Sequence, residues 1–272
     1  MIGNGARLAE GLTAIASRAA AAILAVPQPA LTQREKPDRS PVTAADEASE
    51  AVILEGLAQL LPGVPVVSEE AAGRTTPTPA GRDFVLVDPL DGTRELLAGE
   101  VEYTVNIALV RDGVPALGVI AAPALGLIWR GTTGVGAERL RLSPGADPGQ
   151  ASERTAIHTR RRPAQPVAVI SRFHHQAATD TYLERFTGAQ RVVVGSALKF
   201  CRIAEGVADI YARMSPMSEW DIAAGHALVV AAGGAMTKPD GSPLRYGQAA
   251  VPIASFVAVG DRALIADSKA KA

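Results

Sequence analysis

The spacing of apolar segments is the feature that most restricts the fold of this chain, because it changes character near the middle. After an apolar run at 84–87, further strand-like segments at 103–110, 116–121 and 126–130 are joined by short Gly, Asp or Pro turns, which is typical of an antiparallel meander. After 165, strand-like and helix-like segments alternate, as they do in α/β domains. We therefore predict an α/β protein with an α+β domain at 1–150 and an α/β domain at 151–272, joined through the Pro- and Arg-rich stretch 141–165.

The N-terminal segment predicts an amphipathic helix. Apolar residues recur at helical spacing from Leu8 to Ala19, and the helix is expected to end before Pro27. Its most apolar part, 19–26, is shorter than the roughly 20 residues that span a bilayer, and charged residues such as Glu10 interrupt the pattern of a secretory signal. We expect a cytoplasmic protein without an integral membrane segment, and peripheral membrane association stays open.

Several segments are expected at the surface. The polar or Gly/Pro-rich stretches 33–39 and 71–82 predict loops, and the polar stretch 267–272 predicts a frayed tail. His174 and His175 are adjacent, so their side chains point apart, and we expect them at the surface rather than on a metal ion.

Composition excludes several classes of protein. Lys and Arg number 27 against 28 Asp and Glu, so the chain is not a generally basic protein that coats nucleic acid. Aromatic residues make up only 4%, which argues against a platform that stacks single-stranded bases. The single Cys rules out an intrachain disulfide and a metal site built from several cysteines. We therefore do not expect polymeric nucleic acid as a partner.

The most informative motif is Asp-Pro-Leu-Asp-Gly-Thr at 88–93. It comes directly after the apolar run 84–87, which predicts a buried strand whose end can present groups to a cleft. The Pro and Gly predict a tight turn that aims the carboxylates of Asp88 and Asp91 in one direction. The structural alternative is a turn in which these aspartates only hydrogen-bond their own backbone.

Three more acidic residues lie at the ends of predicted elements, and each has a structural alternative. Glu69 follows a short strand and could be a surface acid before a loop. Asp221 begins a helix, where Asp is a good N-cap. Thr43 and Asp46 have the spacing of a capping box at the start of another helix. A shared site is favoured because all of these acids lie beside small or turn-forming residues.

Carboxylates that converge in one cleft require cations. Two like charges about 5 Å apart repel by roughly 3 kcal/mol at an effective dielectric constant near 20. Oxygen ligands without several Cys or paired His favour a hard ion, Mg²⁺ before Zn²⁺. Such a site suits phosphate chemistry, because the metals bind phosphoryl oxygens and lower the pKa of a bound water.

These motifs resemble a known family. The segments SPVTAAD, VSEE, DPLDGTREL and WDIAAGHAL, in this order, are similar to the inositol monophosphatase superfamily of Mg²⁺-dependent phosphatases. The segments EYTVNIALV and GSALKFCRIAEGVADIYAR resemble its 3'(2'),5'-bisphosphate nucleotidase branch, and the similarity runs from about Lys36 to the helix after Asp221. The resemblance implies a layered αβαβα sugar-phosphatase fold, a homodimer and two or three Mg²⁺ ions.

The resemblance also implies a role for each acid. The expected metal ligands are Glu69, Asp88, the backbone carbonyl of Leu90, Asp91 and Asp221. Asp46 would hydrogen-bond Thr93, and the two would orient the attacking water. Gly92 and Thr93 would take phosphate oxygens, and Asp221 would also lie next to the substrate.

Substrate selection is expected from the second domain. Gly195 and Ser196 open a helix at the cleft edge, and Lys199 follows one turn later. Arg213 occupies a segment in which the inositol-specific relatives carry an acid. Lys199 and Arg213 are therefore candidates for binding a second phosphate, with a solvated helix face and a strand-end surface charge as the respective alternatives. Glu219, which precedes the WDIAAGHAL segment by one residue, has no interpretation.

The resemblance implies hydrolysis of the 3'-phosphate of adenosine 3',5'-bisphosphate to AMP, which in the family clears a by-product of sulfate assimilation. The enzymatic alternative is an inositol-1-phosphatase or a broad sugar phosphatase. The non-enzymatic alternative is a regulator that retains the fold. The set of acids argues against that last alternative, because a protein that keeps only the fold does not need them clustered.

Overall fold

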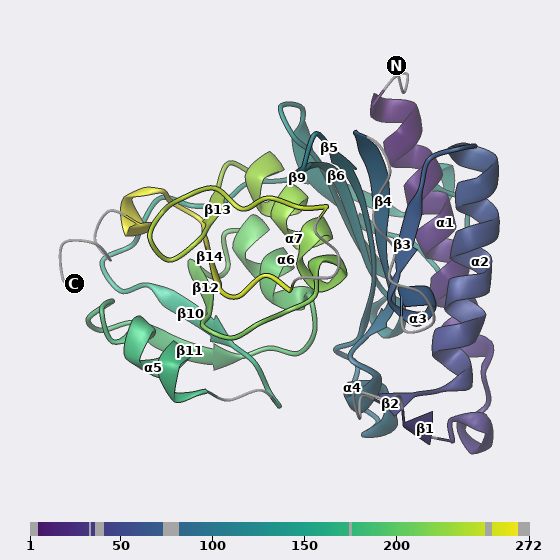
Figure 1. Ribbon diagram of the computed structural model, residues 1–272, viewed down its shortest axis with the longest axis horizontal. Helices are drawn as coiled ribbons and strands as arrows, with labels where there is room; N and C mark the ends of the chain where they lie inside the picture. Colours follow the sequence, from purple (N-terminus) through teal and green to yellow (C-terminus); the bar gives the residue numbers. More distant parts are fainter. Residues whose placement is uncertain are drawn as a thin grey trace.

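The two larger β-sheets and three layers of helices alternate through the molecule (Figure 1). The computed structural model describes residues 5–32, 34–35, 41–72, 82–173, 176–247 and 252–265. The order of layers is a helix pair, a large sheet, a second helix pair, a smaller sheet and a single helix. The predicted αβαβα architecture is confirmed. The loops predicted at 33–39 and 71–82, the pair His174-His175 and the tail at 267–272 lie wholly or largely outside the described residues.

The helices α1 (Gly5–Ala25) and α2 (Ala44–Leu60) form the first layer. The Thr43 hydroxyl accepts a hydrogen bond from the N–H of Ala45 (3.1 Å), and Asp46 completes the predicted capping box. By length and composition, α1 is the one helix among the described residues that could cross a membrane. Its apolar face packs on α2 and on the larger sheet, and 56% of its apolar window is buried there, as in the core helix of a globular protein.

The larger sheet has seven strands and confirms the predicted meander. In spatial order they are β3 (Val66–Ser68), β4 (Asp83–Asp91), β5 (Thr104–Arg111), β6 (Val114–Ala122), β7 (Leu127–Thr132), β8 (Gly136–Arg141) and β9 (Glu153–Ile157). β3 runs parallel to β4, and every other neighbouring pair is antiparallel. Apolar side chains cover both faces, because helices pack on each of them.

The strand β9 differs from the sequence prediction. It lies inside the stretch 141–165, which was expected to be only a connection, and it pairs with β8 at the edge of the larger sheet. Most of its side chains are exposed, so the strand has no apolar alternation to reveal it. The chain passes between the two sheets after Ile157, and the division into domains at 150 stays a prediction.

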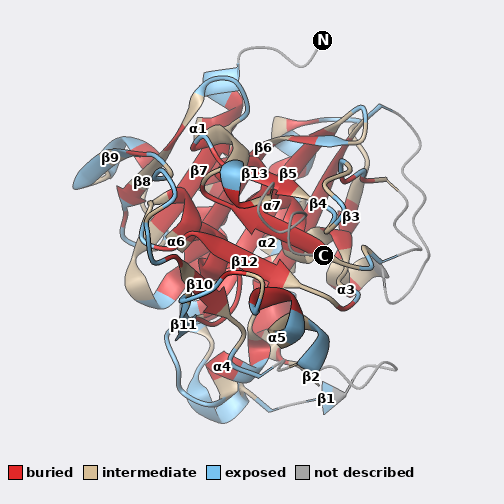
Figure 2. Cartoon of the chain, turned by 90° about the vertical axis from the view of Figure 1, so that its left-hand side faces the viewer, coloured by how far each residue is buried: buried red, intermediate tan, exposed pale blue. Residues whose placement is uncertain are grey.

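The smaller sheet is built from the alternating segments of the second half. Its strands and helices along the chain are β10 (Val167–Ile170), α5 (Ala177–Leu183), β11 (Gln190–Val193), α6 (Leu198–Ala204), β12 (Ile210–Arg213), α7 (Glu219–Ala231), β13 (Ala235–Thr237) and β14 (Phe256–Val259). The strand order is β11-β10-β12-β14-β13, with β10 parallel to β11 and β12, and β14 antiparallel to both of its neighbours. Figure 2 shows that β12 and the helices α6 and α7 are largely buried.

Short elements connect these layers. They are η1 (Gln28–Ala30), β1 (Arg34–Glu35), β2 (Pro41–Val42), α3 (Glu69–Ala72), α4 (Thr93–Leu97), η2 (Pro123–Leu125) and η3 (Pro148–Gln150). β1 and β2 pair with each other, and α3 and α4 follow directly on β3 and β4. The elements α3 and α4 therefore begin where the strands of the larger sheet end.

Two glycines allow α7 to lie directly on the larger sheet. Gly118 on β6 and Gly131 on β7 are cross-strand partners. A Cβ atom at Gly118 would lie only 2.3 Å from the carbonyl oxygen of Ala224, and one at Gly131 would lie 2.8 Å from Cα of Leu228. The helix backbone therefore rests on the sheet at a distance that only glycine permits. This contact sets the height of the first turn of α7, which carries Asp221.

Candidate active site

The end of β4 is a bulged strand, and the tight turn predicted there is wrong. Asp88 pairs with Asn106 of β5, and Asp91 pairs with Thr104, so the stretch from Asp88 to Asp91 has one residue more than the opposite stretch of β5. Residues three apart in a regular strand face opposite sides of the sheet. The extra residue of a bulge shifts this alternation by one. Asp88 and Asp91 therefore face the same side, as the turn hypothesis required.

The structural alternative for this motif, hydrogen bonds from the aspartates to their own backbone, is also partly correct. Oδ1 of Asp88 accepts a hydrogen bond from the N–H of Leu90 (3.1 Å). Gly92 follows with φ of 97°, and a Cβ there would lie 3.2 Å from the backbone of Tyr103. This conformation favours glycine, and it starts α4 at Thr93. The local hydrogen bonds hold the loop that presents the two aspartates.

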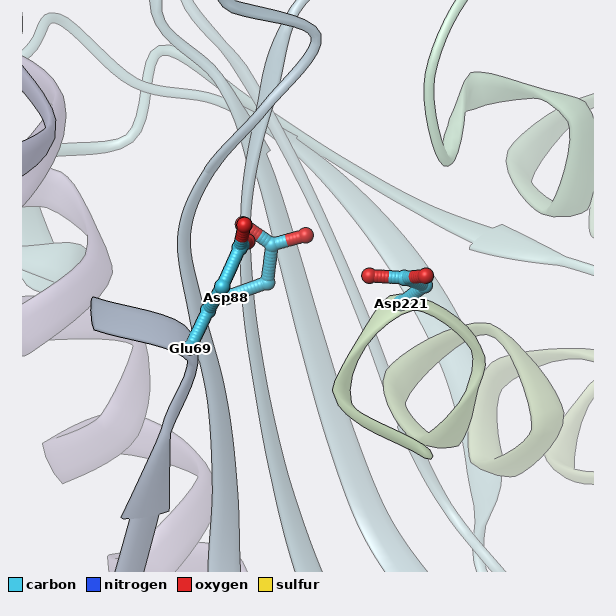
Figure 3. A group of neighbouring side chains, drawn as sticks. All are labelled: Glu69, Asp88 and Asp221. Carbon is cyan, nitrogen blue, oxygen red and sulfur yellow. The ribbon is translucent and has the colours of Figure 1, made fainter. Parts of the chain in front are cut away.

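Three carboxylates converge above this loop. Glu69 at the start of α3, Asp88 on β4 and Asp221 on α7 each place an oxygen within 4.8 Å of the others. Figure 3 shows Glu69 and Asp88 side by side, with Asp221 facing them from α7 across a gap. An all-oxygen set of this kind fits a hard divalent cation such as Mg²⁺. The alternative that Glu69 is only a surface acid before a loop does not explain why its carboxylate lies beside those of Asp88 and Asp221.

Asp221 is in an environment that disfavours its charge unless a cation is near. Burial, and next the negative charges of Glu69 and Asp91, raise the pKa of Asp221 well above its ordinary value. The N-cap of α7 is Ser218 rather than Asp221. Oδ2 of Asp221 accepts from the N–H of Ser218 (3.2 Å), so Asp221 is the acidic member of a capping box. The cap fixes the direction in which the carboxylate leaves the helix.

Asp46 has both of the roles considered for it. Its Oδ2 accepts from the N–H of Thr43 (2.8 Å), which is its part of the capping box, and also from the Thr43 hydroxyl (2.7 Å). Its Oδ1 accepts from the hydroxyl of Thr93 (3.0 Å), across 47 positions of the chain. One carboxylate therefore starts α2 and aims the Thr93 hydroxyl.

A cavity of about 210 Å³ opens over these groups. The predicted site residues that line it are Glu69, Asp88, Leu90, Asp91, Gly92, Thr93, Ser196, Lys199, Arg213 and Asp221. The other two predicted residues, Asp46 and Gly195, lie behind the wall and hydrogen-bond to Thr93 and Glu102. The structure therefore brings the acidic set and the two predicted cations to one cavity.

Lys199 does not lie on a solvated helix face. It is buried, and its Nζ donates to the carbonyl oxygens of Ser196 (2.5 Å) and Val194 (3.3 Å). The ammonium also lies 5.3 Å from the ring centre of Tyr211. Burial lowers the pKa of Lys199 to about 8, although Asp91 opposes this shift. The amine is thus a poorly hydrated cation in the cavity wall.

Arg213 ends β12 and is half-buried. Its Nε donates to the hydroxyl of Ser215 (3.1 Å). Besides lining the main cavity, it lines a second, smaller hollow beside it. The strand-end position is confirmed, and the side chain faces the cavity as well.

Ser196 and Gly195 join the two halves of the cavity. Ser196 has the positive φ of 52°, and its Oγ donates to the Oδ2 of Asp91 (2.7 Å). The N–H of Gly195 donates to Oε2 of Glu102 (3.0 Å), which also accepts from Arg172 (2.5 Å). The corner that carries Ser196 is therefore fastened to the larger sheet at Asp91 and beside it at Glu102.

Some residues of the site were missed from the sequence. Glu95 lines the cavity, and burial followed by the charge of Asp91 raises its pKa. Its place in the segment DPLDGTREL was an available signal. Glu102 is the first residue of the segment EYTVNIALV, which was the corresponding signal. Glu219, which had no interpretation, accepts from the N–H of Gly247 (2.9 and 3.1 Å) and so holds the segment after β13 against α7.

Comparison with protein families gives a match along nearly the whole chain. The model of the Inositol monophosphatase family matches residues 6–270. A 3'(2'),5'-bisphosphate nucleotidase CysQ from Salmonella typhimurium is 42% identical over 231 residues, covering 85% of this chain and 87% of that protein. A histidinol-phosphatase from Mycobacterium tuberculosis is 36% identical over 230 residues, covering 79% and 81%.

Solved structures give the same result. CysQ from Bacteroides thetaiotaomicron, described as a bacterial member of the inositol monophosphatase family, has a TM-score of 0.77 and 31% identity, covering 94% of this chain and 98% of that one. An inositol monophosphatase from Anabaena has a TM-score of 0.74 and 27% identity, covering 98% and 95%. The layered fold described above is therefore shared with these proteins.

Proposed function

Because this chain belongs to the inositol monophosphatase family, we propose that it is a metal-dependent phosphatase that hydrolyses the 3'-phosphate of adenosine 3',5'-bisphosphate. One observation carries the choice of substrate: a single cavity is lined by the carboxylates of Glu69, Asp88 and Asp221 and by two cations, Lys199 and Arg213. A bisphosphate places one anionic group at the metal end and has a second for the cations. The nucleotide itself is proposed from the names of the CysQ relatives.

The proposed metal ligands are Glu69, Asp88, the Leu90 carbonyl, Asp91 and Asp221, and the proposed metal is Mg²⁺, with two or three ions. When bound, these ions neutralise phosphoryl oxygens and lower the pKa of a water molecule. The oxygen-only donor set and the raised pKa of Asp221 support this assignment, because a cation relieves the repulsion among the carboxylates.

The chain's own contribution to the attack is orientation. Asp46 accepts a hydrogen bond from the Thr93 hydroxyl, and a lone pair on the Thr93 oxygen is then oriented to accept a hydrogen bond from the attacking water. The two hydrogen bonds from Thr43 hold Asp46 in place. Water attacks phosphorus in line and the bond from phosphorus to the 3' oxygen breaks. Of the two protons of the water, one ends on the 3' oxygen of AMP and the other stays with the released phosphate. The products are AMP and inorganic phosphate, without a phosphoenzyme.

The second phosphate is proposed to bind Lys199 and Arg213. Lys199 suits an anion because its burial removes competing water, and the pKa of about 8 leaves it mostly charged at pH 7. Gly92, Thr93, Gly195 and Ser196 complete the proposed substrate contacts. For Ser196 and Gly195 this role accompanies the structural one, because both already hold the cavity corner to Asp91 and Glu102.

We also propose a homodimer, a cytoplasmic location and a boundary between two domains near residue 150. The family resemblance supports the first of these, and the apolar face of α1 packed inside the protein supports the second. Light scattering of the purified chain measures the oligomeric state.

A substrate panel with Mg²⁺ tests the proposed function. It comprises adenosine 3',5'-bisphosphate, inositol-1-phosphate, fructose-1,6-bisphosphate and histidinol phosphate, the last included because a histidinol-phosphatase is among the relatives. We expect kcat/KM on the bisphosphate nucleotide to exceed the others by at least about tenfold, a difference of about 1.4 kcal/mol. A tenfold advantage for any other substrate would refute the assignment.

Matched variants then test the cation site. We expect Lys199→Met to raise KM for adenosine 3',5'-bisphosphate by about tenfold or more, because an interaction with an ionised group is lost. The same variant should change KM for inositol-1-phosphate little, since that substrate has no second phosphate. Lys238→Met, at an exposed lysine, is the control. Equal effects of Lys199→Met on both substrates would remove Lys199 from this role.

A further inference from the structure

Asn106 is a buried polar residue that the proposed mechanism does not use. It lies on β5 with 0% of its surface exposed. Neither its Oδ1 nor its Nδ2 has a hydrogen-bond partner among the described residues. A buried polar group without a partner costs about 1–3 kcal/mol, and the large majority of such groups in native proteins are satisfied. An unpartnered amide at this buried position therefore requires a functional explanation.

The position of Asn106 indicates which group it serves. It is paired with Asp88 on β4 and with Ile120 on β6, so Asp88 is its polar cross-strand neighbour. Directly opposite residues of antiparallel strands project from the same face, with Cβ atoms about 4.5–5.5 Å apart. Ala108 and Val110, which share the alternation of Asn106, pack in the core toward α7. The amide therefore lies on the face that carries the carboxylate cluster.

Asp88 has capacity for this partner. Its Oδ1 already accepts from the N–H of Leu90 (3.1 Å), and a carboxylate offers about four lone-pair sites in all. It can therefore bind a cation, keep the Leu90 contact and accept one further hydrogen bond. A donor to a ligating carboxylate fixes its orientation and favours its charged form.

We propose that Asn106 is a positioning residue of the metal centre, whose side-chain amide donates to the carboxylate of Asp88 in the metal-loaded enzyme. The proposal rests on the metal centre assigned above. It gives the buried amide a partner that forms only when the cation draws Asp88 into its ligating orientation. In the metal-free protein the amide has no partner and lowers the stability. In the loaded protein it is hydrogen-bonded to Asp88 and raises the stability.

The test uses Asn106→Leu, which removes both polar atoms and keeps the number and branching of the heavy atoms, and follows thermal unfolding of the full chain. In EDTA, we expect Tm to be equal to or above that of the parent, because a buried unsatisfied group is gone. In a Mg²⁺ titration, we expect the concentration that gives half of the Tm increase to rise by about tenfold or more. The Mg²⁺ dependence of phosphate release should shift in the same direction.

Ile107→Val is the matched control, because Ile107 is the next residue of β5 and lies in the core on the opposite face. It should lower Tm in EDTA and leave the Mg²⁺ midpoint unchanged. If Asn106→Leu does not fold, Asn106→Ala is expected to show the same rise of the midpoint. A midpoint within twofold of the parent in a folded Asn106 variant overturns the proposal. A parent protein whose Tm does not respond to Mg²⁺ overturns the metal centre itself, so the two failures are distinguishable.

Discussion

Replacing Gly118 by alanine tests whether α7 must rest on the larger sheet to bring Asp221 to its partners. The new Cβ would lie 2.3 Å from the carbonyl oxygen and 2.9 Å from Cα of Ala224. Close C···O contacts between backbones are about 3.3 Å, so the helix and the sheet must separate by about 1 Å. The obstructing atoms belong to the backbone and cannot rotate away. Asp221 is one turn before Ala224, so a rigid helix carries it along.

Two measurements follow from this displacement. Overpacking of a core typically costs 1–3 kcal/mol, so we expect urea unfolding to show a loss of about 2 kcal/mol. A misplacement of about 1 Å at a reacting centre can cost about 100-fold, so we expect kcat/KM for adenosine 3',5'-bisphosphate to fall by that order, with a higher Mg²⁺ requirement. Gly149→Ala is the control, because no atom lies within 4 Å of the Cβ it would add. It should match the parent in both measurements.

The two readouts can disagree, and that outcome is informative. If Gly118→Ala is less stable but keeps the parental kcat/KM and Mg²⁺ dependence, then β6 or its neighbours absorb the strain and the helix does not transmit it to Asp221. If stability is also unchanged, the close contact between Gly118 and Ala224 is not a constraint at all. Either result refutes the argument that the glycine sets the position of the carboxylate.

Three charged or titratable groups give further predictions. Asp91→Asn keeps the shape of the side chain but removes its charge, so phosphate release should fall by about 100-fold or more, and survival of the original rate contradicts the metal assignment. The hydrogen bond from Arg130 lowers the pKa of Glu10 from 4.5 to about 2, so Glu10 adds stability above pH 4.5 that is lost as the pH falls toward 2. Because the Glu10 side chain is 43% exposed, we expect Glu10→Gln to cost only about 1 kcal/mol at pH 7 in urea unfolding, with the gap closing in acid. Burial lowers the pKa of His226 from 6.5 to about 4, so stability should fall as the pH drops from 6.5 to 4, and His226→Gln, tested by Tm against pH, should remove that part of the slope.

Local patterns were sufficient where the structure depends on neighbours in sequence. The meander was predictable because each strand from β4 onward pairs with the next one, and only short connections separate the strands from β5 to β8. The capping box at Thr43 and Asp46 was readable because its members lie three residues apart. The acids of the site could be found because they stand at the ends of such elements.

Other features depend on layers that meet far apart in the chain. Lys199 has the sequence context of an exposed helix face, and it is buried because α6 packs on β12, where its ammonium lies beside the ring of Tyr211. Glu219 was not interpretable because its partner, the N–H of Gly247, is 28 positions away. The strand β9 lacks apolar alternation because it is an exposed edge, so pairing with β8 is its main determinant.

Because of the bulge in β4, the site depends on the spacing and backbone between two of its aspartates as well as on the residue types. Asp88 and Asp91 are three residues apart on β4, but their partners Asn106 and Thr104 are only two apart on β5. The extra residue on β4 is what lets both aspartates face one cavity. In a regular ladder with the same three-residue spacing, one of the two aspartates would face α1 and α2 instead. A deletion at position 89 or 90 would leave both aspartates on one face, two residues apart, but would remove the bulged backbone between them. The acids and the bulge are therefore both needed to present Asp88 and Asp91 as they lie here.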